Sequence, residues 1–324
     1  MKNPPIGGFF ELELPSKKMV GYHPKALALT NGRACMTWIL ENEQPSKVFL
    51  PYYCCRALYE PMVAKGIACE FYNIDSKLNP IDLTTPEEGE LLVYINFFGL
   101  KNRECEELSG VLGRKLVVDD THRFFHHGYE GAYSFTSARK YFGVPDGAYL
   151  YPPDESLADD IPRFDRPSLQ HGLKRLIGDQ DAAFRAFQRY ENSLGIEVFR
   201  ISEISERLLG GVDYEFAKTR RRENFEFLHK KLQSLNRLDV NMCLVDIPFC
   251  YPFLPSKKID KSNFYASNIF VPTLWPDILE RNDPDYILEC ELTEQLLPLP
   301  VDQRYSHEEM NRIIELTNNL IENE

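Results

Sequence analysis

The stretch KVFLPYYCCRALYEPMVAKGIACEFYNID (residues 47–75) decides the fold of this chain. Its two ends, KVFLPYY (47–53) and ACEFYNI (68–74), are short apolar runs of the kind found in buried strands. Between them, CRALYEPMVAKG (55–66) has a helical pattern, and Gly66 is a suitable C-cap. A strand, a helix and a second strand in this order predict a parallel βαβ unit.

Four more runs downstream extend the same pattern. They are ELLVYINFFG (90–99), KLVVDD (115–120), AYSF (132–135) and GAYLY (147–151). Near-continuous apolar strands that alternate with helices predict an α/β fold, with a mostly parallel central sheet covered by helices on both faces. Such sheets bind ligands at the carboxyl ends of their strands, so we expect the functional residues there.

The character of the sequence changes after about residue 167. Residues 178–209 and 214–236 predict long amphipathic helices. The run Arg220–Glu223 in the second helix is interpreted as a solvated helix face. We expect a large domain over residues 1–212 and a smaller C-terminal α+β domain over residues 213–324.

The C-terminal part is expected to hold a small β-containing lobe over residues 239–300. The last segment, SHEEMNRIIELTNNLIENE (306–324), predicts a closing helix. Ser306 is its expected N-cap and Glu309 the capping-box partner.

Composition narrows the possible function. With 37 basic and 49 acidic residues among 324, the net charge is −12, which disfavours nucleic-acid binding as the main function. No stretch approaches the roughly 20 apolar residues of a membrane span, and the first residues do not resemble a secretory signal. Eight cysteines without a CxxC pair predict reduced thiols in a cytoplasmic protein.

Three segments carry residues suited to chemistry. Asp119 ends a strand, and a carboxylate there can keep a pyridine nitrogen protonated, with His122 three residues further on. Lys140 lies between small hydroxyl residues and a Gly-Val-Pro-Asp-Gly turn (143–147). An enclosed, neutral lysine is a nucleophile for an aldehyde and then a general base. Arg139 is expected to point the opposite way, as neighbours along an extended chain do.

The third segment is Thr30–Cys35, a Gly-containing turn that opens a helix and offers free N–H groups to a phosphate. It lacks both the dinucleotide and the Walker glycine patterns. His122, His126 and His127 lack matching carboxylate or cysteine ligands, so no metal site is predicted.

Taken in order, these segments resemble the DegT/StrS-like family of sugar aminotransferases, which are fold-type-I pyridoxal-5′-phosphate (PLP) enzymes. The resemblance runs from about residue 6 to 320. The matching motifs are LTNGRACMTWIL (29–40), VFLPYYCCRALYEPMVAKGIACEFYNID (48–75), VYINFFG (93–99), VVDDTH (117–122), SFTSARKYFGVPDGAYLY (134–151), FRISEISERLLGGVDYEFAKTRRRENFEFL (199–228) and LLPLPVDQRYSHEEMNRII (296–314).

The resemblance implies a role for each matching residue. Lys140 would be the Schiff-base lysine and proton shuttle, Asp119 the partner of the pyridine nitrogen, and His122 a contact of the ring. The phosphate would be held by backbone N–H groups of the helix-opening turn and by a serine hydroxyl, and a further residue would reach across a dimer interface. The implied cofactor-binding residues are Gly32, Arg33, Ala34, Tyr53, Ser134 or Ser137, and Arg200.

Several departures from the family pattern affect these roles. Arg33 stands where the family has a small residue and would itself neutralise the phosphate, and the stretch between His122 and Ser134 is shorter than in the family. The family has an aromatic residue where this chain has Cys55, so Tyr53 is expected to stack on the ring instead. The family often has an Asn two residues before the interface arginine, where this chain has Val198.

The resemblance therefore implies an aminotransferase that moves an amino group from glutamate or glutamine to a keto sugar of the nucleotide-linked kind. The reaction would serve polysaccharide or glycoconjugate biosynthesis, in a cytoplasmic homodimer with PLP. Two alternatives stay open: a PLP enzyme of the acyl-CoA condensing type, which also has an acid with a histidine three residues on, and a non-catalytic homologue with a regulatory or assembly role.

Overall fold

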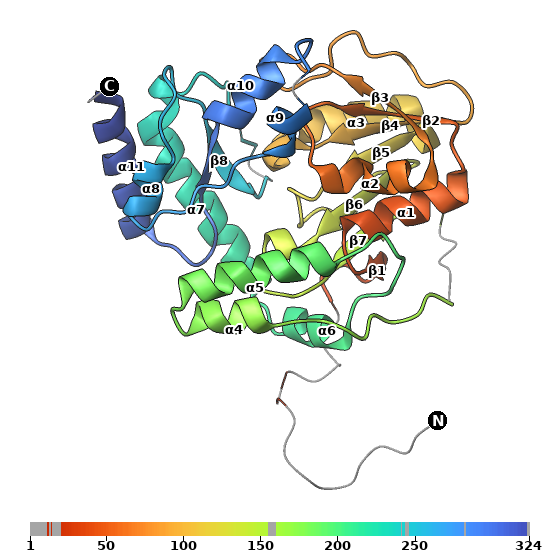
Figure 1. Cartoon of the computed structure of the whole chain (residues 1–324), viewed down its shortest axis with the longest axis horizontal. Coiled ribbons are helices and arrows are strands. Elements are labelled where there is room, and N and C mark those ends of the chain that lie inside the picture. The colour runs from red at the N-terminus through yellow and green to blue at the C-terminus, as the bar shows by residue number, and fades with distance from the viewer. Residues whose placement is uncertain are drawn as a thin grey trace, which may run out of the picture.

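The computed structural model describes residues 12, 14, 21–154, 160–240, 242–243, 246–281 and 283–322. Most of residues 6–20, where the resemblance begins, lie outside this set. Within it, the main sheet has seven strands in the order β1-β7-β6-β5-β4-β2-β3 (Figure 1). These strands are β1 (Leu27–Leu29), β2 (Lys47–Pro51), β3 (Ala68–Tyr72), β4 (Glu90–Ile95), β5 (Leu116–Asp119), β6 (Tyr133–Ser137) and β7 (Ala148–Tyr151).

The predicted mostly parallel sheet is confirmed. Strands β3, β2, β4, β5 and β6 pair in parallel, and β7 and β1 add two antiparallel pairings at one edge. The helices of this part are α1 (Gly32–Glu43), α2 (Arg56–Lys65), α3 (Asn102–Leu112), α4 (Gln170–Leu176), α5 (Gln180–Ser193) and α6 (Glu203–Gly210). Helix α1 packs on β6 and β7, α2 on β3, and α3 on β5. Gly66 ends α2 in the left-handed conformation, as predicted.

A second, two-stranded sheet lies in the C-terminal part, where Figure 1 shows it beside α7. Its strands β8 (Cys250–Phe253) and β9 (Leu297–Pro300) are antiparallel. The helices here are α7 (Tyr214–Leu232), α8 (Ser262–Ala266), α9 (Asp277–Arg281), α10 (Ile287–Gln295) and α11 (His307–Glu322). The capping box before α11 is confirmed, because the backbone N–H of Ser306 donates to the Glu309 carboxylate at 2.8 Å.

The single long helix expected over 178–209 is wrong. Helix α5 ends at Ser193, and residues 194–202 run extended until Ser202 caps α6. The extended segment gives its backbone hydrogen bonds to the strand region: Ile201 N–H donates to the Ala28 carbonyl, and Thr30 N–H to the Phe199 carbonyl. Tertiary pairing therefore overrides the helical pattern.

Short 3₁₀ turns occur between the other elements. They are η1 (Phe97–Gly99), η2 (Gly113–Lys115), η3 (Ala138–Lys140) and η4 (Gln233–Leu235), and two of them, η1 and η3, follow β4 and β6. Turn η3 follows β6 directly and carries Lys140. In the residues that the structure describes, no helix is long and apolar enough to cross a membrane.

Candidate active site

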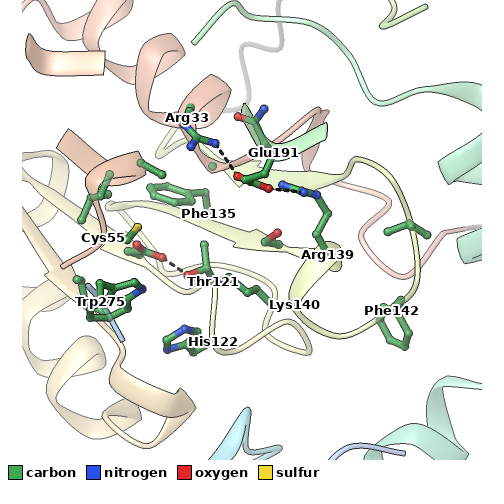
Figure 2. A pocket seen from close by; sticks show the side chains of 18 of the residues that line it. Arg33, Cys55, Thr121, His122, Phe135, Arg139, Lys140, Phe142, Glu191 and Trp275 are labelled. Carbon is green, nitrogen blue, oxygen red and sulfur yellow. Dashed lines mark hydrogen bonds and ion pairs between the residues drawn. The ribbon is translucent and has the colours of Figure 1, made fainter. Parts of the chain in front are cut away.

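A cavity of about 230 Å³ lies where the parallel strands end, as the sequence predicts. Ile95, Asp119 and Ser137, the last residues of β4, β5 and β6, line it together with Gly32 at the start of α1. Lys140 lines the same cavity. Figure 2 shows Trp275 and His122 toward one side and Glu191 with two arginines toward the other, with Phe135 and Thr121 between them in this view.

Asp119 forms the floor of the cavity. Its side chain is buried, and the Thr121 backbone N–H donates to Oδ1 at 2.9 Å. Burial raises the pKa of Asp119 to about 6, although hydrogen bonds from Thr121 and the charge of Lys140 act in the opposite direction. The carboxyl is therefore poised to ionise fully when a cationic group approaches it.

His122 lies in an aromatic stack beside Asp119. Its ring is parallel to that of Phe249 at a centroid distance of 4.3 Å, and to that of Trp275 at 6.1 Å. Burial, and then the charge of Lys140, holds the pKa of His122 well below its usual range. The Phe98 backbone N–H donates to Nδ1 at 3.3 Å, so the proton of the neutral ring is assigned to Nε2. His122 can therefore offer an N–H donor to a ligand.

Lys140 lines the cavity at the end of turn η3, but the residue is exposed, so the enclosed lysine expected from the sequence is wrong. In the described part of the chain, no side chain or carbonyl accepts a hydrogen bond from it, which leaves its amine free to react. Arg139 also lines the cavity, contrary to the expectation that it points away. The reason is local: residues 138–140 form a 3₁₀ turn rather than a strand, so neighbouring side chains do not alternate.

The start of α1 provides an anion site with fewer donors than expected. Asn31 caps the helix, and its Oδ1 accepts from the Ala34 N–H at 2.9 Å. Ala34 is fully buried and does not line the cavity. The backbone N–H groups of Gly32 and Arg33 therefore remain to face an anion.

The two serines of β6 lie on opposite faces of the strand. Ser137 lines the cavity with Phe135, while Ser134 does not. The side chains of a strand alternate between faces, so positions 135 and 137 share the cavity face and position 134 faces away. Of the two hydroxyls that the sequence left open, that of Ser137 is the one beside the cavity.

Trp275, and not Tyr53, lines the cavity wall. Tyr53 is fully buried and does not line the cavity; it packs under Trp275, with ring centroids 5.0 Å apart. Cys55 does line the cavity, and burial raises the pKa of its thiol to about 11. A ring bound over Asp119 would therefore meet Trp275, with Tyr53 supporting it from behind.

Arg200 lies outside the cavity. Its side chain is exposed, while its backbone pairs with Pro162 and Phe164. The preceding residue, Phe199, accepts a backbone hydrogen bond from Thr30 beside the start of α1. In this chain, Arg200 therefore contributes no side chain to the cavity.

Glu191 is the main cavity residue that sequence reasoning missed. It lies on α5, and its two carboxylate oxygens accept from Arg33 Nη1 at 3.0 Å and Arg139 Nη2 at 2.6 Å (Figure 2). Burial alone would raise the pKa of Glu191, but the charge of Arg139 and the hydrogen bonds from both arginines outweigh it, and the pKa falls to about 2. No motif marks this residue in the sequence, because its partners come from distant segments.

Arg221 corrects the interpretation of the Arg220–Glu223 run. It is 1% exposed, with its guanidinium 4.2 Å from the centre of the Tyr141 ring. Its hydrogen bonds go to the carbonyls of Pro248 and Phe249 and to Gln303. Because Tyr141 follows Lys140 in the chain, this buried cation helps to fix the wall that carries the lysine.

Comparisons with known proteins agree with this architecture. No family model matches the sequence, and no curated protein does. Solved structures do match in fold. A DegT/DnrJ/EryC1/StrS aminotransferase from Brucella abortus has 15% identity and a TM-score of 0.63 over 91% of this chain and 85% of that one. DesV from S. venezuelae, solved in complex with a ketimine intermediate, has 16% identity and a TM-score of 0.66 over 92% and 85%.

The sugar aminotransferase CalS13 from Micromonospora echinospora also matches, with 15% identity and a TM-score of 0.60 over 92% of this chain and 88% of that one. The chain shares the fold of these proteins. At these identities the likeness establishes the fold, and it confirms the fold class predicted from the sequence. Within this fold, chemistry has to be argued from the residues of the cavity.

Proposed function

We propose that this protein is a PLP-dependent aminotransferase that moves an amino group from glutamate or glutamine to a keto sugar of the nucleotide-linked kind, in polysaccharide or glycoconjugate biosynthesis. The observation that carries the proposal is the shared cavity of Lys140 and Asp119 at the strand ends. A free amine above a buried carboxyl suits an aldehyde-bearing pyridine ring.

The residues present fit PLP. Asp119 is a buried acceptor for a protonated ring nitrogen, and His122 offers an N–H to the ring or its oxygen. The N–H groups of Gly32 and Arg33 and the hydroxyl of Ser137 would hold the phosphate. Trp275 would cover one face of the ring. When bound, PLP supplies an electron sink that stabilises negative charge on the carbon bearing the amino group.

The protein side of the reaction then rests on three groups. Lys140 would move a proton as general base and acid, since its amine is free of other partners in the described residues. Asp119 would hold the proton on the ring nitrogen. His122, neutral and fixed in its stack, would keep its N–H directed at the ligand.

We further propose a cytoplasmic homodimer in which Arg200 serves the partner's site; its exposure beside the start of α1 supports this role. All eight cysteines are free, which suits a reducing compartment. The proposed division at residue 212 is supported by the positions of the two sheets, since the strands of the first end at Tyr151 and those of the second begin at Cys250.

The purified protein tests the proposal directly. We expect a yellow protein in which borohydride fixes the cofactor to the peptide that contains Lys140, as seen by mass spectrometry. Lys140→Ala should abolish this adduct, while Lys65→Ala, which removes a lysine at the end of α2, should not. A colourless wild-type protein that takes up no PLP would contradict the proposal.

A half-reaction identifies the reaction class. Glutamate or glutamine alone should convert bound PLP to pyridoxamine phosphate. An enzyme of the acyl-CoA condensing type would not make this conversion. Tight PLP binding without any turnover would favour a non-catalytic role.

A further inference from the structure

Arg33 and Arg139 converge on one carboxylate beside the reactive lysine. Arg33 comes from the first turn of α1 and Arg139 from turn η3, and each contacts one oxygen of Glu191, at 3.0 and 2.6 Å. The side chains of both arginines are only 14% exposed. Two guanidinium groups that share the two oxygens of one carboxylate form a binding site with defined geometry.

The carboxylate that fills this site comes from a weakly attached element. Helices α4 and α5 pack mainly on each other, and in the described residues no backbone hydrogen bond joins them to the main sheet. Their outer surfaces expose large apolar side chains, among them Leu176, Ile177 and Phe184. Glu191 therefore provides much of the polar attachment between this helical pair and the cavity.

Glu191 also has room to leave. It lies at the border of the cavity and a second, more open hollow on α5, which Arg185 and Arg189 line. Arg33 also has an ion pair with Glu60 at 2.8 Å, which stays in place when Glu191 leaves. If another carboxylate takes the place of Glu191, Arg139 stays neutralised and Arg33 keeps two anionic partners. The displaced side chain then faces a hollow that also carries positive charge.

We propose that Arg33 and Arg139 form a carboxylate clamp, filled by Glu191 in the free protein, and that a carboxylate of the amino-acid donor replaces Glu191 when the donor binds. The identity of the donor rests on the proposed function. The clamp neighbours Lys140 in the chain and in the cavity, so an amino acid held there by its carboxylate has its amino group on the side of the reactive amine. The phosphate has its own donors in the N–H groups of α1 and in Ser137.

Binding of glutarate, a dicarboxylate with no amino group to transfer, tests the clamp by calorimetry on the full-length protein. Because Glu191 competes with the probe, Glu191→Ala should tighten glutarate binding about tenfold or more. Adding Arg139→Gln to Glu191→Ala should remove this gain. Glu107→Ala and Arg103→Gln, which break an exposed ion pair on α3, are the matched controls and should leave glutarate affinity unchanged.

Three results would overturn the clamp. The first is a glutarate affinity that does not respond to Glu191→Ala. The second is a gain for inorganic phosphate without a gain for glutarate, which would assign the arginines to the phosphate site. The third is a gain that persists without Arg139. Glu191→Gln, which keeps the side-chain volume, repeats the test if the alanine variant melts at a much lower temperature.

The outcomes for the clamp and for the proposed function are separable, because glutarate binding needs neither cofactor nor turnover. If Glu191→Ala tightens glutarate binding as expected but the protein catalyses no aminotransfer, only the proposed function is contradicted. If the protein is an active aminotransferase but its glutarate affinity does not change with Glu191→Ala, only the clamp is contradicted.

Discussion

Replacing Asp119 by Asn should stabilise the cofactor-free protein at alkaline pH. Burial raises the pKa of Asp119 to about 6 from 3.8, so the folded state holds this proton more tightly than the unfolded state does. The resulting stability is present below about pH 4 and is lost as the pH rises through about 6. This rise in pKa corresponds to a loss of roughly 3 kcal/mol of stability at alkaline pH, which Asn avoids because it never ionises. Asn also keeps an oxygen that can accept from the Thr121 N–H.

The size of the effect can be measured by thermal unfolding across pH. An unfolding entropy of about 2.1 cal/mol/K per residue gives about 0.7 kcal/mol/K for a chain of this length, so 3 kcal/mol raises Tm by about 4 °C. We expect this increase at pH 8 and little of it at pH 4, where Asp119 in the folded protein is neutral. With PLP present, the wild-type protein should have the higher Tm, because the amide that replaces the Asp119 carboxylate in the variant carries no negative charge to pair with a protonated ring nitrogen. An unchanged or lower Tm for the cofactor-free variant at pH 8 would refute the reasoning.

Three further changes probe the walls of the cavity. Gly99→Ala should lower the free energy of unfolding by about 2 kcal/mol or more, because Gly99 has φ +75° and a Cβ there would overlap the His122 carbonyl. Urea unfolding measures this loss, and Gly110→Ala on α3, where a Cβ would meet open space, is the control. Arg221→Met should lower the free energy of unfolding by about 2–4 kcal/mol, because the carbonyls of Pro248 and Phe249 lose their donor. Arg220→Met on the same helix should change it by less than about 0.5 kcal/mol, and equal losses for the two variants would contradict the buried role of Arg221. The Trp38→Phe variant keeps one tryptophan, Trp275, which lines the cavity, so ligand binding should quench its fluorescence. The Trp275→Phe variant keeps Trp38, and its fluorescence should be largely unchanged.

The strands of the main sheet and the strand ends that carry the site could be predicted from the sequence. Buried parallel strands are continuous apolar runs, and the polar residue that ends such a run marks the ligand-binding edge. This reasoning located Asp119 directly. The edge strand β1 was not predicted, because its three residues are too short to form a pattern.

The walls of the cavity could not be predicted in the same way. Trp275 and Glu191 come from segments far from Asp119 in the chain, and only tertiary packing brings them to the strand ends. Arg221 looked like part of a charged surface because three arginines are consecutive, and helix rotation alone decides which of them is buried. Tyr53, expected to stack on the ring, is buried and does not line the cavity; it packs against Trp275, which does.

The two acids of the cavity differ in a way that sets the direction of a bound ligand. In the described residues, Asp119 has no cation in hydrogen-bond contact and its pKa rises, whereas Glu191 has two and its pKa falls. The floor at β5 therefore favours a ligand cation, while the backbone N–H groups at the start of α1 favour a ligand anion. A ligand that carries a protonated ring nitrogen at one end and an acidic group at the other matches this polarity in one orientation only. The reverse orientation would place an anion against a buried carboxyl and a cation against the positive end of the α1 dipole, both of which are costly in a site of low polarity. This asymmetry exists before any ligand binds and would present the same end of each such ligand to Lys140.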